Sequence, residues 1–442
     1  MKFGFVPGQE NAQRGSNSFA FDRLVSRFEG NRGEGVRGNR RERFQQSSER
    51  SGGTSVSRNE TLDAGAGATA PGVAVPLSGE GTNPDASLLN RGTIVGRGEA
   101  PPADEAAGDG VRFEGPRTEE GFEPATLSAD VVNTGTITSE STVGPTAGVR
   151  FVDGVGVQGD VVNTSTGEIS GANNGVYFGE GDHTGGSLLN AGTISSDSRA
   201  VNIDGDGLTV VNSGTIEGTG DQRNGTVYGD GTAENFTVVN TRSGVIDAGE
   251  GNDGSGLAHE IGDETDDVVD GTILNGGTIQ GRGTGDTATT IGHGLRLNGG
   301  AGTDGTAVFA GDVVNAGTIA GSADSEAAAG ISIEEVGLSG RIVNVGSISG
   351  SVNAIDASTA TGGVNIVNAG EIDGNVVLSM GDDVFTVIEG ASLSGEINAG
   401  GGFDTLNLIF DDREAAVQFA DSASASSFER INIGGVQYRG VV

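Results

Sequence analysis

The chain of 442 residues has no cysteine and no tryptophan, only three histidines and three tyrosines, and a single lysine, Lys2. Without cysteine it can form neither a disulfide framework nor a cysteine-ligated zinc site, and it has no thiol nucleophile. No apolar run approaches the roughly 18 residues that a transmembrane helix requires. These absences exclude disulfide-stabilised, cysteine-zinc, thiol-dependent and helical transmembrane proteins. The fold must therefore be inferred from the residues that are abundant.

Glycine is abundant, with 82 copies. A glycine in a helix interior costs about 1 kcal/mol relative to alanine, so this composition argues against a helical protein. The glycines follow no strict three-residue period, which excludes collagen. Hydrophobic residues still make up 34% of the chain, enough to form a core. The composition therefore predicts a turn-rich β structure.

Charge is distributed unevenly. The net charge is -36, yet residues 1–60 carry 11 basic and 7 acidic side chains, so the remainder carries -40. We expect residues 1–61 to form a disordered arm rich in Arg, Gly and Ser, and residues 62–86 to form a linker. Arginine interleaved with phenylalanine in the arm also fits stacking on single-stranded nucleic acid, and a solvated tail is the other interpretation. The acidic remainder repels nucleic acid.

One motif of about seven residues recurs ten times, as in Val131-Val-Asn-Thr-Gly-Thr-Ile137. Two copies carry a two-residue insertion, and the mean period is near 31 residues. Between copies lies a second short alternation of apolar and other residues, such as Gly148-Val-Arg-Phe151. The recurring asparagines are Asn90, Asn133, Asn163, Asn190, Asn212, Asn240, Asn275, Asn315, Asn344 and Asn368.

This periodicity predicts an all-β solenoid over residues 87–410, with one coil per repeat and about ten to twelve coils. Coils in such a fold stack about 4.8 Å apart, so equivalent residues lie on one another. We expect Val and Ile to point inward and the ten asparagines to form a structural ladder at the turn. The glycine two residues after each asparagine suggests a turn with positive φ.

The Asn-x-Gly-Thr-Ile repeat, over about residues 86–410, resembles the passenger domains of bacterial autotransporters, the adhesin-like proteins of type V secretion. The sequences Met380-Gly-Asp-Asp-Val-Phe385 and Gly395–Leu408 are similar to the last passenger coils and the following junction. The resemblance implies a right-handed, single-stranded parallel β-helix of the pectin-lyase-like kind. It also implies that residues 411–442 are a C-terminal cap or the start of an autochaperone region. The signal peptide and the outer-membrane barrel of that family are not visible in this sequence.

The resemblance further implies a non-enzymatic, adhesin-like passenger that is extracellular or on the bacterial outer surface. It would bind an unknown cell-surface or matrix ligand through its loops and long solenoid face, without a cofactor. Ten equivalent asparagines fit a structural role, because an active site needs only one. Two alternatives stay open: a surface-layer protein that associates with itself, and a polysaccharide-degrading hydrolase or lyase of β-helix type.

The hydrolase alternative depends on Gly292-His293-Gly294, which is similar to the histidine motif of polygalacturonase-like enzymes. Asp266 and Asp267 lie upstream, and a carboxylate pair of this kind provides acid and base for glycoside cleavage. The other motifs of that family are absent. A lyase that uses a lysine base is excluded because Lys2 is the only lysine, whereas an arginine base is not.

Metal binding has one set of candidate ligands. Asp382, Asp383 and Asp404 follow glycine-rich turns that look like half-turns of calcium-binding nonapeptide repeats. Those repeats bind calcium in tandem, whereas these turns are isolated, so solvated turn carboxylates are the other interpretation. The three histidines, His183, His259 and His293, fall in different repeats, which argues against a histidine metal site.

Overall fold

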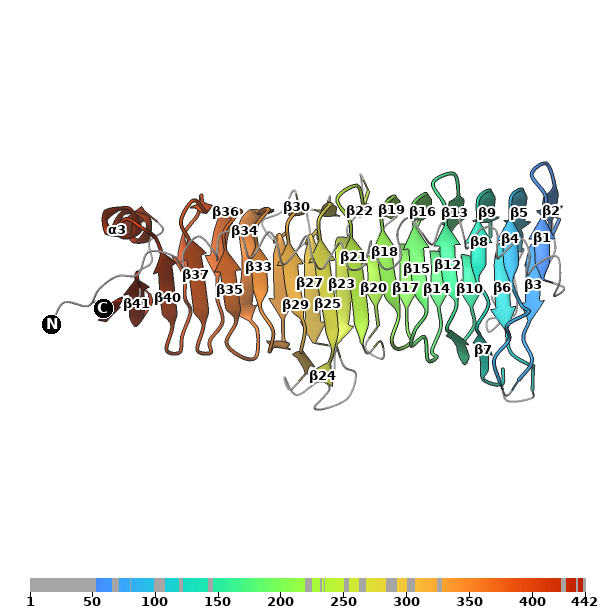
Figure 1. Ribbon diagram of the computed structural model, residues 1–442, viewed down its shortest axis with the longest axis horizontal. Coiled ribbons are helices and arrows are strands. Elements are labelled where there is room, and N and C mark those ends of the chain that lie inside the picture. Colours follow the sequence, from blue (N-terminus) through green and yellow to red (C-terminus); the bar gives the residue numbers. More distant parts are fainter. Residues whose placement is uncertain are drawn as a thin grey trace. The chain divides into compact units, whose positions relative to one another are not determined.

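The computed structural model describes residues 53–65, 71–79, 81–98, 108–118, 122–141, 146–218, 225–230, 233, 235–249, 254–261, 268–283, 292–299, 307–323, 328–422, 427–434 and 436–439. They belong to one compact unit, Ser47–Val442. The chain coils repeatedly, and each coil contributes up to three short strands that pair in parallel with the equivalent strands of the neighbouring coils (Figure 1). The fold is therefore the predicted parallel β-helix.

The first column of strands contains the Val-Val-Asn half of each repeat and forms a 15-stranded sheet. Between the ten repeats each pairing keeps the asparagines in register, as in Asn133 with Asn163. Its strands are β1 (Thr54–Val56), β4 (Leu88–Asn90), β8 (Val131–Asn133), β12 (Asp160–Asn163), β15 (Ser187–Asn190), β18 (Thr209–Asn212), β21 (Phe236–Asn240), β25 (Gly271–Asn275), β29 (Asp312–Asn315), β33 (Ile342–Asn344), β35 (Asn365–Asn368), β37 (Val384–Ile388), β40 (Thr405–Ile409), β41 (Arg430–Ile433) and β42 (Val436–Arg439).

The second column contains the Thr-Ile half of each repeat, and its isoleucines are in register, as in Ile137 with Ile169. A two-residue turn joins it to the first column in most repeats. Its strands are β2 (Thr61–Asp63), β5 (Thr93–Gly96), β9 (Thr136–Ser139), β13 (Glu168–Gly171), β16 (Thr193–Ser196), β19 (Thr215–Gly218), β22 (Val245–Asp247), β26 (Thr278–Gly283), β30 (Thr318–Ala323), β34 (Ser347–Thr359), β36 (Glu371–Val377) and β38 (Ser392–Leu393).

The third column contains the second alternation of each repeat. The long strands β34 and β36 continue from the second column into it, which joins both columns into one 22-stranded sheet. Its other strands are β3 (Val73–Pro76), β6 (Val111–Glu114), β10 (Ala147–Phe151), β14 (Asn174–Phe178), β17 (Arg199–Ile203), β20 (Gly225–Gly229), β23 (Ser255–Ile261), β27 (Leu295–Gly299), β31 (Ile331–Glu334) and β39 (Ile397–Asn398).

Short strands widen the corner between the third and first columns in some coils. β7 (Ala125–Leu127) pairs with β11 (Val155–Val157), and β24 (Val268–Val269), β28 (Val308–Phe309) and β32 (Gly337–Leu338) form a three-stranded sheet. After β40 the helix α3 (Arg413–Ser422) begins where the Asp412 side chain accepts a hydrogen bond from the Glu414 N–H. No helix among the described residues is long and apolar enough to cross a membrane.

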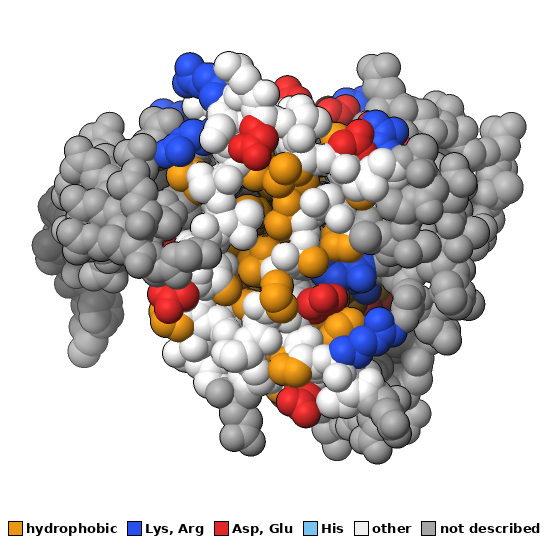
Figure 2. Space-filling view, turned by 90° about the vertical axis from the view of Figure 1, so that its right-hand side faces the viewer, with side chains coloured by type: hydrophobic (Ala, Val, Ile, Leu, Met, Phe, Trp, Pro, Cys, Tyr) orange, Lys and Arg blue, Asp and Glu red, His pale blue; other side chains and the backbone are white. Residues whose placement is uncertain are grey.

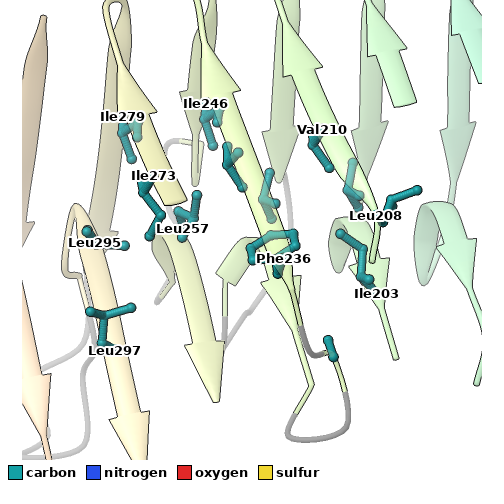
Figure 3. Packing of buried hydrophobic residues seen from close by; sticks show 14 of the residues in the cluster. Ile203, Leu208, Val210, Phe236, Ile246, Leu257, Ile273, Ile279, Leu295 and Leu297 are labelled. Carbon is teal, nitrogen blue, oxygen red and sulfur yellow. The ribbon is translucent and has the colours of Figure 1, made fainter. Parts of the chain in front are cut away.

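The core is the inside of the coils, where alternate residues of every strand meet (Figure 3). The rings of Phe113, Phe151 and Phe178 stack at centroid distances of 4.8 and 5.0 Å, one ring per coil. Isoleucines such as Ile216, Ile246 and Ile279 form a similar inward column and are fully buried. A single coil cannot bury its apolar side chains alone, so each coil is stabilised by the coils stacked on either side of it.

The glycine after each asparagine has a different cause from the one predicted. None of these turn glycines lies among the residues with positive φ. Instead, a Cβ on Gly135 would overlap the carbonyl oxygen of Gly92 in the adjacent coil, and a Cβ on Gly214 would overlap that of Gly192. Glycine is required here because two backbones approach closely, and the prediction of a left-handed turn was wrong.

The domain boundaries need a correction at the N-terminal side. Strands β1, β2 and β3 lie within residues 54–76, where the sequence suggested the end of an arm and a linker. The solenoid therefore begins at Thr54 rather than at residue 87. At the other side β41, beyond residue 410, pairs in parallel with β40, so with β1 the stack has more coils than the ten to twelve expected. The part of the arm before residue 53 lies outside the described residues.

The two ends of the stack differ. In the described residues, β1, β2 and β3 each pair with another strand on one side only. Figure 2 shows this end, with hydrophobic side chains in the middle and charged ones around them. At the C-terminal end, β42 pairs antiparallel with β41, while Ala416 of α3 is buried in the core and Phe419 packs against it. The described part of residues 411–442 thus contains a helix and a hairpin, and the assignment of this segment as a cap or junction stays a prediction.

Candidate functional site

The ten predicted asparagines form one continuous column at the turn between the first and second strands. Each side-chain Nδ2 group donates to the Oδ1 atom of the next asparagine, at 2.8–3.0 Å, in nine consecutive bonds. Nδ2 also donates to a backbone carbonyl of the next coil, as from Asn212 to Val245. All ten side chains are buried. The hydrogen-bonding groups of these side chains are already paired with neighbouring coils, so the asparagines have a structural role.

The first column also has an outward-facing apolar row, which we call the aliphatic stripe. It consists of the residue before each ladder asparagine, and this residue is valine or leucine in all ten repeats. None of the ten belongs to the large cluster of inward-facing hydrophobic residues. Register places them on one another from coil to coil: Leu89, Val132, Val162, Leu189, Val211, Val239, Leu274, Val314, Val343 and Val367.

Exposure varies along the aliphatic stripe. Leu89, Val239 and Leu274 are buried, and the other seven side chains are partly exposed. At about 4.8 Å per coil, the ten residues span about 43 Å. Contiguous apolar surface on a protein commonly marks an interaction site. From the sequence we predicted only inward aliphatic columns, although the two consecutive aliphatic residues of each motif already signal a second, outward row.

The outer face of the third column is polar and heavily paired. The Arg150 guanidinium lies 4.5 Å from the ring centroid of Tyr177, and that of Arg199 lies 3.8 Å from the ring of Tyr228. The Tyr228 hydroxyl donates to Glu260 at 2.5 Å. These contacts connect consecutive coils, so the arginines and tyrosines brace this face.

Tyr177 connects two carboxylates of this face. Its hydroxyl lies 2.7 Å from Asp204 Oδ2 and 3.1 Å from Asp153 Oδ1. Burial raises the pKa of Asp204 to about 6. The nearby charges of Asp230 and Asp153 also raise this pKa, whereas the hydrogen bond from Tyr177 lowers it. Burial and Asp204 likewise raise the pKa of Tyr177 above its usual value. The hydroxyl is therefore a fixed hydrogen-bond donor rather than a nucleophile.

A shallow groove follows the end of the second column where β9, β13 and β16 end. Its volume is about 210 Å³, below the roughly 300 Å³ at which ligand-enclosing pockets usually begin. Several lining hydroxyls are already engaged, since Ser139 donates to Gly108 and Ser196 donates to Asn173. The lining residues are Ser139, Glu140, Ser170, Gly171, Ala172, Ser195, Ser196 and Asp197. The groove suits small polar groups better than an enclosed organic ligand.

His293, the centre of the hydrolase alternative, is held by structural contacts. Its Nδ1 atom accepts a hydrogen bond from the Ala329 N–H at 2.9 Å, and Nε2 lies 3.3 Å from Glu334 Oε1. Arg296 donates to the other oxygen of Glu334. Burial alone raises the pKa of Glu334, but the hydrogen bonds from His293 and Arg296 outweigh it and hold that pKa well below its usual range. Asp266 and Asp267 lie outside the described residues.

The other two histidines are buried in different coils. His183 Nδ1 accepts from the Val157 N–H at 3.1 Å, and Nε2 lies 3.0 Å from the Gly179 carbonyl oxygen. His259 Nε2 lies 3.1 Å from the Ala233 carbonyl oxygen, and its ring packs edge-on against Phe236. Burial lowers the pKa of His183 and lowers that of His259 to about 4. Both rings are therefore neutral parts of the core at pH 7.

Acidification is expected to destabilise the coils around His259. The unfolded chain binds a proton near pH 6.5 while the folded chain does not until about pH 4, so stability falls as pH decreases through this window. Between pH 7.5 and pH 5.5 the loss is about 1.3 kcal/mol. His259→Gln, which keeps a donor for Ala233, should remove this component from the pH dependence of urea unfolding. An unchanged slope in the variant would contradict the assignment.

The three candidate calcium ligands lie close together near the C-terminal end of the stack. Asp382 is exposed and accepts a hydrogen bond from the Phe403 N–H, whereas Asp383 and Asp404 are buried. Both oxygens of Asp383 accept hydrogen bonds, from Val364 and from Ser379. Across the described residues, no group of three or more His, Cys, Asp or Glu side chains is arranged to hold a metal ion. Calcium binding here stays a prediction.

The fold and its repeats define the chain as a parallel β-helix. Comparisons with models of known protein families, with curated proteins and with solved structures gave no match.

Proposed function

We propose that the chain is a non-enzymatic, adhesin-like β-helical passenger that acts outside the cell or on a bacterial outer surface. The observation that carries this proposal is the aliphatic stripe. Valine or leucine occupies an outward position in all ten repeats, although burial of the core needs only the inward residues. Interaction surfaces combine an apolar centre with a polar rim, and here the partly exposed polar residues Thr209, Thr272 and Asp312 occupy the other outward position of the same strands.

The repeat supports the same proposal. A solenoid presents equivalent side chains at a fixed spacing on a long face, which suits the recognition of extended partners. The hydrogen-bonded state of His293 favours a structural role for the residue on which the hydrolase alternative depends. The alternative of self-assembly uses the same aliphatic stripe, so one set of variants addresses both.

The test replaces three stripe residues by threonine, in the variant Val132→Thr/Val162→Thr/Val211→Thr. Threonine is β-branched and of similar size, so the fold should keep its stability to within about 0.5 kcal/mol per site. Binding to immobilised collagen, fibronectin and laminin and to a glycan array is expected to weaken at least tenfold, or about 1.4 kcal/mol. The matched control, Thr136→Val/Thr193→Val/Thr215→Val, changes outward residues of the second column and should bind as the wild type does.

Three outcomes would count against the proposal. The first is a wild-type chain that binds nothing on the panel, and the second is a stripe variant that binds as tightly as the wild type. The third is release of reducing ends from polygalacturonate by the purified chain. Sedimentation velocity separates adhesion from self-assembly, because only the latter predicts a concentration-dependent oligomer that the stripe variant loses.

A further inference from the structure

The first coil of the stack has three strand edges without a neighbour. Among the described residues, β1 pairs only with β4, β2 only with β5 and β3 only with β6. In β1 the Thr54 N–H donates to the Ser87 carbonyl, and the Val56 carbonyl accepts from the Arg91 N–H. Parallel neighbours bond through alternate residues, so Thr54 and Val56 face β4. The N–H and C=O of Ser55, between them, therefore point away from the stack.

The other two strands of this coil have outward backbone groups as well. By the same alternation, these belong to Thr61 and Asp63 in β2. In β3 they belong to Ala74 and to Pro76, which has a carbonyl but no N–H. The side chains of these residues and of Ser55 are exposed. An edge strand with available N–H and C=O groups is a template for pairing with another chain.

The charge of this end indicates which chain fits it. Residues 53–79 carry one basic and two acidic side chains, whereas the whole chain has a net charge of -36. The Asp63 carboxylate is paired with Arg97 of the next coil at 2.9 Å. Two copies of an acidic chain repel each other, and the repulsion is weakest where their charge is balanced. A basic partner would prefer the acidic remainder, so the neutral end favours a second copy of this chain.

The opposite end of the stack is arranged differently. There β42 pairs antiparallel with β41, and Ala416 of α3 is buried in the core. The first coil of another copy would have to displace these elements, so we expect like ends to meet, about a two-fold axis. An axis through the middle of the first column places Ser55 opposite Ser55 of the second copy, in an antiparallel pair that exchanges two N–H···O bonds. It also places β2 opposite β3 of the second copy.

We propose that the first coil is an interface for a second copy of this chain, which joins two solenoids at their N-terminal ends through antiparallel pairing of β1 with β1. Ser55 lies in register with Leu89, the first residue of the aliphatic stripe. The dimer therefore aligns both stripes on one face and presents them together to a partner. That last consequence rests on the proposed function, whereas the dimer does not.

Sedimentation velocity of the full chain tests the proposal, with a dimer expected to form between about 1 and 100 µM. Ser55→Lys places two like charges opposite each other across the axis, and Ser55→Glu does the same with the other sign. Each variant alone should raise the dissociation constant at least tenfold. An equimolar mixture of the two should dimerise again, with a dissociation constant within about threefold of the wild-type value.

Two controls accompany these variants. Asn365→Lys adds the same charge at an exposed strand residue in another coil and should dimerise as the wild type does. The stripe variant Val132→Thr/Val162→Thr/Val211→Thr should also keep the dimer, since none of its changes lies in the first coil. Recovery of the dimer in the mixture shows that both Ser55 variants are folded, so a misfolded variant cannot imitate the expected result.

Several results would overturn the proposal. They are a wild-type chain that stays monomeric at 100 µM, a Ser55→Lys variant that dimerises as the wild type does, and a stripe variant that loses the dimer. Oligomers larger than a dimer would contradict closure about a two-fold axis. Hydrogen exchange provides the last result: if the Ser55 and Ala74 amides are protected as well at 1 µM as at 100 µM, a segment of the same chain occupies the edge.

Discussion

Replacing Asn212 by alanine is expected to lower the free energy of unfolding of the middle coils by about 4 kcal/mol, because several buried polar groups lose their partner at once. Asn190 loses the Oδ1 acceptor that it reaches at 2.9 Å, and Asn240 loses the donor at 3.0 Å. The Gly214 N–H and the Val245 carbonyl also lose their side-chain partner. Each unsatisfied buried group costs about 1–3 kcal/mol.

The measurement needs local resolution, since a solenoid need not unfold in one step. Native-state hydrogen exchange of amides in β15, β18 and β21 reports the loss directly, and urea unfolding reports its effect on the whole stack. Asn365→Ala is the matched control, because Asn365 is an exposed asparagine at the start of β35. It should change stability by less than about 0.5 kcal/mol. A loss below about 1 kcal/mol for Asn212→Ala would show that the ladder does not stabilise the stack.

The asparagine column and the inward aliphatic columns could be predicted from the sequence because their period equals one coil. When the coils stack, residues one repeat apart in the sequence therefore lie next to each other in space. The coils without the motif could not be found this way. Val56 occupies the position of Asn90 in the first coil, and Val387 occupies that of Asn368 after the last copy.

These terminal coils show that the fold does not depend on the asparagine. Their inward residues, among them Val56, Val387 and Leu408, are buried as fully as those of the middle coils. Apolar burial alone therefore continues the stack where the polar column has stopped. A search for the asparagine motif underestimates the number of coils, because the motif marks the polar column rather than the buried apolar residues that continue the stack.

The outward surfaces were less predictable for a different reason. That the aliphatic stripe faces away from the core follows from strand alternation once the inward row is known. Which of its residues are buried does not, since Val239 is 0% exposed and Val211 in the preceding coil is partly exposed in the same register. Asp404 Oδ2, which is buried without a hydrogen-bond partner among the described residues, is likewise a property of the tertiary arrangement rather than of any motif.

Gly214→Ala is expected to destabilise the stack by about 3 kcal/mol, since overpacking against backbone leaves little room for relaxation. The new Cβ would overlap the carbonyl oxygen of Gly192 in the adjacent coil. That oxygen accepts a hydrogen bond from the Thr215 N–H at 2.9 Å, so a shift that relieves the overlap also weakens the ladder between the coils. Urea unfolding and hydrogen exchange in β16 and β19 measure the effect.

Two other glycines separate close approach from backbone conformation. Gly362 has open space around its Cα and no positive φ, so Gly362→Ala should be neutral or stabilising by about 0.5 kcal/mol. Gly185 also has open space but a φ of 92°, so Gly185→Ala should lose about 1 kcal/mol through strain alone. If Gly214→Ala behaves like Gly362→Ala, the coils can separate at the turn and close packing does not determine the repeat. A loss well above that of Gly185→Ala identifies the neighbouring backbone as the reason for glycine beside every ladder asparagine.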